Sequence, residues 1–225
     1  MKIITFTCDK NCWATVPFAH QFNKYWYKKE TVDVVGNKLP RRKLPDNFNF
    51  VSIGDYPVQR WTNQLIDYLN SIEDDLFIFF LEDYWLKTAV DEVCIKAMYE
   101  YAQTLPNLLR IDLTADRAQH RTAYKYHEYF GYDIIRTKQP TPYQMSYQAG
   151  IGNRNNLLKV LTANRNAWQS EIQGSKELPD DYLVLGTLAN PVSYVPVLRR
   201  NKKGVQNFDR FTVEDQHELI KMIQK

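Results

Sequence analysis

A run of six apolar residues covers positions 76–81 and follows an acidic triplet at 73–75. An apolar run without polar interruption is typical of a strand buried on both faces, as in the centre of a mostly parallel sheet. Glu82 and Asp83 follow the run directly. In open α/β sheets ligands bind beyond the carboxyl ends of the strands. We therefore expect these acids to hold a metal or polar ligand, or alternatively to cap the next helix or turn.

Short apolar runs alternate with helical apolar stripes through the first half of the chain. The pattern predicts strands at 3–7, 31–35, 50–53 and 108–113, and helices at 16–27, 61–72 and 90–105. Thr88 and Asp91 resemble a capping box before the third helix. This order of elements predicts an α/β fold in a single domain, with a mostly parallel sheet flanked by helices.

The second half of the chain is less regular. Residues 114–142 are polar, rich in tyrosine and without a period, which favours an insertion or a region that faces an acceptor. Residues 143–151 alternate like a strand and lead into a leucine-rich helix. A second helix is expected after the leucine-rich one, and Gly174 is expected to end it. A late strand is predicted at 193–198 and a last helix from Thr212 to 223, with Asp215 in its first turn.

Composition narrows the classes of protein to consider. The 225 residues fit one domain, and 29 basic against 26 acidic residues give a net charge of +3, too balanced to drive non-specific nucleic-acid binding. Aromatic residues make up 14 % of the chain, so stacking faces for bases or sugars are available. Three cysteines without a matching cluster indicate neither a disulfide framework nor a zinc site. No apolar segment is long enough to cross a bilayer, so a soluble protein of the reducing cytoplasm is expected.

The acidic strand end and two later motifs together resemble a known family. The segment Tyr147-Gln148-Ala149-Gly150-Ile151 precedes a leucine-rich helix and then Trp168-x-x-Glu171-x-x-Gly174-Ser175. In a group of small bacterial and viral GT-A-type glycosyltransferases, a Gln-Ala segment, a Trp–Glu pair and a Gly-Ser recur in this order after an acidic motif. The resemblance covers about residues 2–194. It departs at Glu82-Asp83-Tyr84, which replaces a strict DxD, and at Gly152, where an aromatic residue is expected.

This resemblance implies a GT-A-like fold, with residues 1–113 binding a nucleotide-sugar and 114–225 facing the acceptor. The implied enzyme moves a sugar from a nucleotide-diphosphate donor, expected to be a UDP-sugar, to an acceptor hydroxyl with inversion. Asp83 is the expected principal ligand of a divalent metal, manganese or magnesium, with Glu82 as an auxiliary ligand, because hard cations prefer oxygen ligands. Glu171 is the expected catalytic base, and Asp112 is the next acid to consider.

Two further groups of residues are expected at the donor. Thr7, Asp9 and Lys10 follow the first strand, where the first β-α turn of such sheets meets a nucleotide. A basic turn near the end of the chain is a candidate to close over the diphosphate, or alternatively a solvated turn. It contains Arg199, Arg200, Lys202 and Lys203.

The acceptor and the class of activity are left with alternatives. A basic run at 38–43, together with Arg117, Arg121 and Lys125, favours DNA that carries a hydroxylated base, and a saccharide is the alternative. A nucleotidyltransferase of similar architecture would need a glycine-rich loop after the first strand, and residues 8–14 contain no glycine. A nucleic-acid-binding module built from the basic run and the tyrosine-rich segment is a third possibility.

Overall fold

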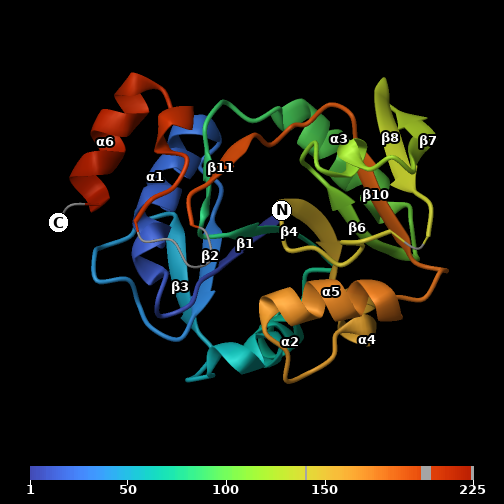
Figure 1. The fold of residues 1–225 in the computed structure, drawn as a ribbon, viewed down its shortest axis with the longest axis horizontal. Helices are drawn as coiled ribbons and strands as arrows, with labels where there is room; N and C mark the ends of the chain where they lie inside the picture. Colours follow the sequence, from blue (N-terminus) through green and yellow to red (C-terminus); the bar gives the residue numbers. More distant parts are fainter. Residues whose placement is uncertain (140, 199–203, 224–225) are drawn as a thin grey trace.

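Nine strands form one sheet through the middle of the molecule, and helices cover both of its faces (Figure 1). The computed structural model describes residues 1–139, 141–198 and 204–223. The sheet order is β3-β2-β1-β4-β9-β6-β10-β8-β7. The strands are β1 (Lys2–Phe6), β2 (Val32–Gly36), β3 (Phe48–Ser52), β4 (Leu76–Leu81), β6 (Leu108–Asp112), β7 (Ala123–Tyr129), β8 (Tyr132–Thr137), β9 (Gly150–Asn153) and β10 (Leu183–Thr187).

Strand direction confirms the expected mostly parallel α/β sheet. Strands β1, β2, β3 and β4 pair in parallel, as do β6 and β10. Strand β9 is antiparallel to both β4 and β6, and β8 is antiparallel to β10 and β7. All strands of this nine-stranded sheet except β9 and β8 therefore point the same way. Because β9 lies between β4 and β6, the two halves of the chain share one continuous sheet.

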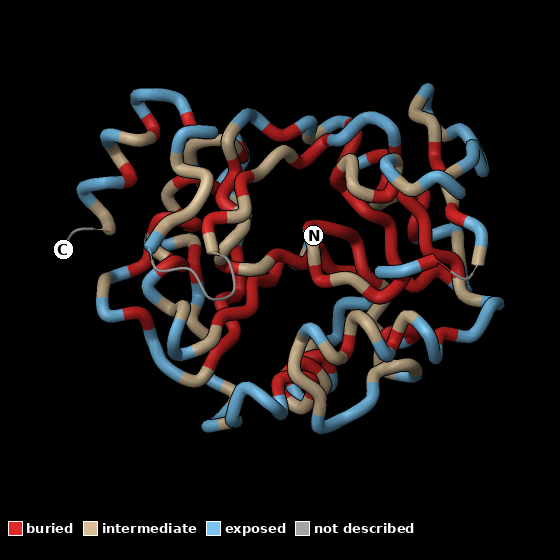
Figure 2. Tube along the Cα trace, viewed as in Figure 1, coloured by how far each residue is buried: buried red, intermediate tan, exposed pale blue. Residues whose placement is uncertain are grey.

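The helices divide between the two faces of the sheet and create two apolar cores. The helices are α1 (Thr15–Tyr25), α2 (Trp61–Ser71), α3 (Glu92–Gln103), α4 (Arg154–Val160), α5 (Ala167–Glu177) and α6 (Val213–Ile223). One core joins α1, α3 and α6 to residues such as Ile78 and Phe80 of β4, and the other joins α2 and α4 to Phe77 and Phe79. Figure 2 shows the buried residues along the strands between these helices. No described helix has the length and apolarity needed to span a bilayer.

Four details differ from the sequence-based predictions. Residues 114–142, expected to lack regular structure, contain the β7–β8 hairpin. In the segment 143–151 the strand begins only at Gly150. Helix α5 continues past Gly174 to Glu177, because Gly174 contributes close packing instead of a helix end: an added Cβ would lie 3.1 Å from Cγ of Met145. Helix α3 is capped by Asp91, whose carboxylate accepts from the Cys94 N–H at 2.9 Å.

Two further strands, β5 (Tyr84–Leu86) and β10, were not predicted from the sequence. Strand β10 (Leu183–Thr187) adds to the sheet beside β6, and a short pair joins β5 to β11 (Tyr194–Pro196). The pair uses the expected late strand as the partner of β5. The β5–β11 pair lies next to the acidic residues, since β5 begins immediately after the acidic pair at 82–83.

Candidate functional site

The acidic pair forms the turn between β4 and β5, at the carboxyl end of the central buried strand. Leu81, the last residue of β4, pairs with Phe6, the last residue of β1. The N–H of Glu82 also donates to the Phe6 carbonyl at 3.4 Å. The expected strand at 76–81 is confirmed, and the acids lie beside the turn that follows β1. They cap neither of the flanking helices.

Glu82 is the more buried of the two acids, with 5 % of its surface exposed. Burial and the neighbouring charge of Asp83 raise the pKa of this carboxyl well above its ordinary value, while interactions with the Asn11 side chain and the Cys8 backbone lower it. Its carbonyl accepts from the indole Nε1 of Trp85 at 3.0 Å. Glu82 is therefore fixed between the first β-α turn and β5, and a carboxylate there is held at an energetic cost.

Asp83, the second acid of the turn, has an environment that differs from that of Glu82. Burial raises the pKa of this carboxyl to about 6, partly offset by its own backbone N–H. Its carbonyl accepts from the Val197 N–H at 2.9 Å. The phenol of Tyr84 also has a raised pKa, first because it is buried and then because of the charges of Asp83, Glu171 and Asp116. Acids from three segments thus act on one tyrosine beside the end of β4.

Glu171 is brought to this region by helix α5. The helix begins with a complete capping box between Asn166 and Gln169, and its Glu171 carboxylate accepts from the Tyr147 N–H at 2.9 Å. Burial raises the pKa of Glu171; the Tyr147 N–H, the Arg110 charge and the Ser146 hydroxyl lower it, and the Asp83 charge raises it further.

The two motifs of the family resemblance meet at this contact. Ser175 Oγ accepts from the Met145 N–H at 3.0 Å, and the hydroxyls of Tyr147 and Ser170 lie 2.6 Å apart. Segment 145–148 therefore lies along one side of α5. Trp168, the other member of the Trp–Glu pair, is 59 % exposed.

Asp112 is a poor candidate for a base. It lies at the end of β6 and is buried between two arginines, with Oδ1 2.5 Å from Nη2 of Arg110 and Oδ2 2.6 Å from Nε of Arg117. Although burial raises the pKa of this carboxyl, the two arginines outweigh it and hold the pKa below the ordinary value. A carboxylate stabilised in this way has little tendency to take a proton.

The expected nucleotide contacts after β1 differ in their exposure. Thr7 is buried, and its hydroxyl donates to the Cys8 carbonyl at 3.4 Å. Asp9 and Lys10 are exposed, and Asp9 pairs with Lys38 Nζ at 2.9 Å. Asn11, which the sequence did not single out, interacts with Glu82. Arg199, Arg200, Lys202 and Lys203 lie outside the described residues.

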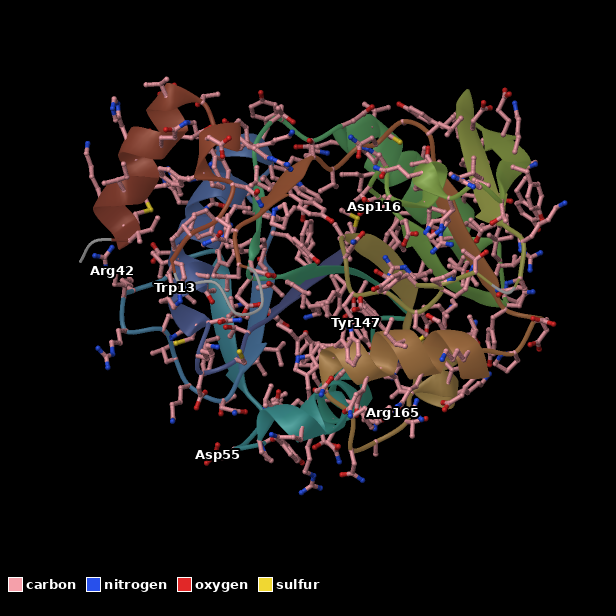
Figure 3. All side chains as sticks on the ribbon, in the orientation of Figure 1. Trp13, Arg42, Asp55, Asp116, Tyr147 and Arg165 are labelled. Carbon is pink, nitrogen blue, oxygen red and sulfur yellow. The ribbon has the colours of Figure 1, made fainter. Side chains whose placement is uncertain are left out.

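The basic residues expected to meet DNA do not form one surface. The run at 38–43 connects β2 to β3 at one end of the sheet, whereas Lys125 lies in β7 at the other end. With strands about 4.8 Å apart, these ends are on the order of 30 Å from each other. Arg117 is 2 % exposed, and Lys125 pairs with Glu128 and Asp133. Figure 3 shows Arg42 at the far left of the view, remote from Asp116 and Tyr147.

The acidic pair offers a divalent metal two carboxylates. Among residues 1–139, 141–198 and 204–223, no three His, Cys, Asp or Glu side chains are grouped to hold a metal ion. Glu82 and Asp83 supply two adjacent carboxylates whose pKa values are raised by burial. Two carboxylates suit Mg²⁺ or Mn²⁺ only when substrate phosphates and water complete the coordination.

A cleft opens beside these acids and contains residues that the sequence did not single out. One cavity, of about 280 Å³, is lined by Asp116, Tyr143 and Gln148 among others. A second, of about 330 Å³, includes Asp116 and Gln148 again, with Tyr84 and Tyr194. We call the two together the Asp116 cleft. These residues come from β5, β11, the loop after β6 and the segment before β9, so they become neighbours only through the tertiary structure.

Comparisons with known proteins give no match in sequence and a weak likeness in structure. No family model and no curated protein matches the sequence. Among solved structures, the chain is similar to a crystal structure of an active-site mutant of LgtC, a glycosyltransferase, with a TM-score of 0.41 and 10 % sequence identity. The match covers 84 % of this chain and 68 % of the other. Similarity at this level does not identify a shared activity.

Proposed function

We propose that this protein is a nucleotide-sugar-dependent glycosyltransferase that inverts the anomeric centre and uses Glu171 as its base. The observation that carries the proposal is the gathering of Glu82, Asp83 and Glu171 beside the end of β4, each with a raised pKa and with Asp83 acting on both of the others. Buried acids that repel one another are costly for stability, and such groups are concentrated at functional sites.

The proposed reaction requires one proton acceptor. The acceptor hydroxyl oxygen attacks the anomeric carbon of the donor, and the bond from that carbon to the diphosphate oxygen breaks. The electron pair leaves with the diphosphate, and the hydroxyl proton passes to Glu171. The Tyr147 N–H positions Glu171 for this step, and together with the Arg110 charge it favours the ionised carboxylate against the effect of burial. General-base assistance of this kind contributes about 10²–10⁴-fold.

The acidic pair is proposed to serve the leaving group. Asp83 is the principal ligand and Glu82 the auxiliary ligand of a divalent cation, manganese or magnesium, held together with the donor diphosphate. When bound, the cation supplies positive charge that stabilises the departing diphosphate. The raised pKa values support this role, because two buried carboxylates next to each other favour binding of a cation.

The proposed donor is a UDP-sugar. Thr7, Asp9 and Lys10, in the turn beside Glu82, are its proposed base and ribose contacts, and Arg199, Arg200, Lys202 and Lys203 are proposed to meet the diphosphate. The position of the first turn supports the assignment. Strands β1 and β4 end at Phe6 and Leu81, which pair with each other, so the turn after β1 lies beside the acidic pair.

A thermal-shift screen tests the proposed function. The protein is melted with UDP, GDP, CDP or ADP, each with and without manganese, because a ligand that binds only the folded protein raises its melting temperature. We expect UDP with manganese to give the largest shift and Asp83→Asn to abolish it. Incubation with UDP-sugars should then release UDP. Absence of any manganese-dependent nucleotide shift contradicts the proposal.

A further inference from the structure

The Asp116 cleft adjoins the proposed reaction centre on the side of β5. Tyr84 lines the cleft, and the charges of Asp83 and Glu171 both raise the pKa of its phenol. The two cavities meet at Asp116 and Gln148. A molecule that enters the cleft therefore lies next to the acids assigned to the donor and the base.

The walls of the cleft provide aromatic faces. The rings of Tyr84 and Tyr194 are 4.4 Å apart at 42° to each other. Tyr143, on the other side, has φ of 60° and is 43 % exposed. Its carbonyl accepts from Nη2 of Arg117 at 3.3 Å, which helps to hold the residue in this uncommon conformation. Strained residues of this kind are concentrated at ligand sites.

The polar groups of the cleft are suited to hydroxyl groups. Oδ2 of Asp116 accepts from the hydroxyls of Thr114 at 3.3 Å and Tyr194 at 3.2 Å. A carboxylate has about four acceptor positions, so Asp116 retains capacity for a ligand. Gln119 and Gln148 add neutral amides, which both donate and accept, and His120 lines the same cavity.

The described lining is short of cations that are available to a ligand. Arg117 contributes to the wall, but its guanidinium donates to Asp112, Thr137, Gln144 and the Tyr143 carbonyl. Arg210 lines the second cavity and is exposed. One such arginine is offset by the charge of Asp116. Binding of a phosphodiester chain depends on several lysines or arginines that neutralise successive phosphates.

We infer that the Asp116 cleft is the acceptor subsite and that it takes an uncharged, hydroxyl-rich saccharide, with Asp116 and Gln148 binding its hydroxyls and the tyrosines packing on its rings. That the bound saccharide is the acceptor of the reaction rests on the proposed function. Binding of a saccharide by the cleft is independent of the proposed function. The inference selects the saccharide over the hydroxylated DNA base.

The test measures acceptor binding and donor binding separately. Saturation-transfer NMR is recorded with lactose, maltotriose and methyl mannoside, with UDP and manganese present. Calorimetry follows UDP binding on the same samples. The variants are Asp116→Asn, Gln148→Ala and the control Asp67→Asn. Asp67, an exposed residue of α2, also accepts from a tyrosine hydroxyl, that of Tyr56 at 2.5 Å.

We expect at least one of the three saccharides to bind, and Asp116→Asn to weaken it about tenfold through loss of a charged hydrogen-bond acceptor. Gln148→Ala weakens it too, and Asp67→Asn leaves it unchanged. UDP binding stays the same in all three variants. Thermal melting checks that each variant is folded.

Two results overturn the inference. One is binding of none of the three saccharides by protein that binds UDP. The other is binding of a duplex carrying hydroxymethylcytosine at low salt that Asp116→Asn abolishes. If saccharide binds at Asp116 and no nucleotide binds, the proposed function fails and the cleft remains a carbohydrate site.

Discussion

The Glu171 carboxylate accepts a hydrogen bond from the Tyr147 backbone N–H at 2.9 Å, across 24 residues of sequence. The contact joins α5 to the segment that leads into β9, and the charge of Arg110 acts on both residues. Arg110 also donates to the Gln148 carbonyl at 3.2 Å. The Tyr147–Gln148 backbone is thus held between a cation on β6 and an anion on α5.

Replacing Glu171 tests its role as base. Glu171→Gln retains a side-chain oxygen that accepts from the Tyr147 N–H but cannot take a proton. We expect transfer to fall by about 10²–10⁴-fold while UDP binding is preserved. The control is Glu177→Gln on the same helix, where Glu177 is exposed and pairs with Arg165. Turnover of Glu171→Gln within about threefold of wild type would remove Glu171 from the mechanism, since such a difference is well under 1 kcal/mol in the barrier.

The pH dependence of transfer should report the environment of Glu171. A base acts in its ionised form, so kcat/KM falls as pH drops through its pKa. Burial raises that pKa, and Arg110 lowers it. Arg110→Gln removes the lowering charge, so the acidic limb of the profile should move to higher pH, and Arg110→Lys should move it less.

A matched arginine serves as the control for that profile. Arg154 donates to the Ile72 carbonyl at 2.9 Å and lies 3.7 Å from Asp75, near the start of β4. Arg154→Gln should leave the acidic limb in place. An acidic limb that is identical in wild type and folded Arg110→Gln would show that Arg110 does not act on the base.

Asp83→Asn should separate metal-dependent donor binding from folding. The amide has the same shape as the carboxylate but supplies no charge, so we expect UDP binding in manganese to weaken by at least tenfold in calorimetry. The melting temperature should be no lower than that of the wild type, because burial disfavours the Asp83 charge. Asp74→Asn removes an exposed acid before the other end of β4 and should change neither property. Wild-type affinity in Asp83→Asn would contradict its role as a ligand.

Glu82 should cost stability in the unliganded protein. Its folded pKa is raised, so the folded state holds the proton more tightly than the unfolded state does. The contribution of Glu82 to stability is therefore greatest at low pH and falls as pH rises from the unfolded pKa through the folded one. Glu82→Gln cannot ionise, and we expect it to gain about 1 kcal/mol at pH 8, or roughly 2–4 °C in Tm.

That gain should largely disappear at pH 4, where Glu82 is protonated in the folded state and mostly protonated in the unfolded state. Thermal melts of the wild type and Glu82→Gln across pH 4 to 8 measure the difference. A Tm difference that does not depend on pH would mean that the charge of Glu82 carries no penalty. Glu73→Gln, an exposed neighbour of the strand, should show no pH-dependent difference.

The local sequence pattern determined those helices and strands in which buried positions recur at a regular spacing. The apolar run at 76–81 predicted β4 as a central strand, and its residues alternate between the two cores as Phe77 and Phe79 on one face and Ile78 and Phe80 on the other. The mostly parallel α/β sheet and the acids at its carboxyl edge followed from the same periodicity. These features depend on neighbours within a few residues, which is why sequence alone reveals them.

Contacts between distant segments were decided only by the tertiary structure. Strand β9 enters between β4 and β6 because Gly152 leaves room for the Phe77 ring, which would be 2.8 Å from an added Cβ. The same assembly neutralises Asp112 with two arginines and brings Glu171 to Tyr147. It also forms the Asp116 cleft from β5, β11, the loop after β6 and the segment before β9. Such pairings depend on which strands become neighbours in the sheet, and no period in the sequence records that choice.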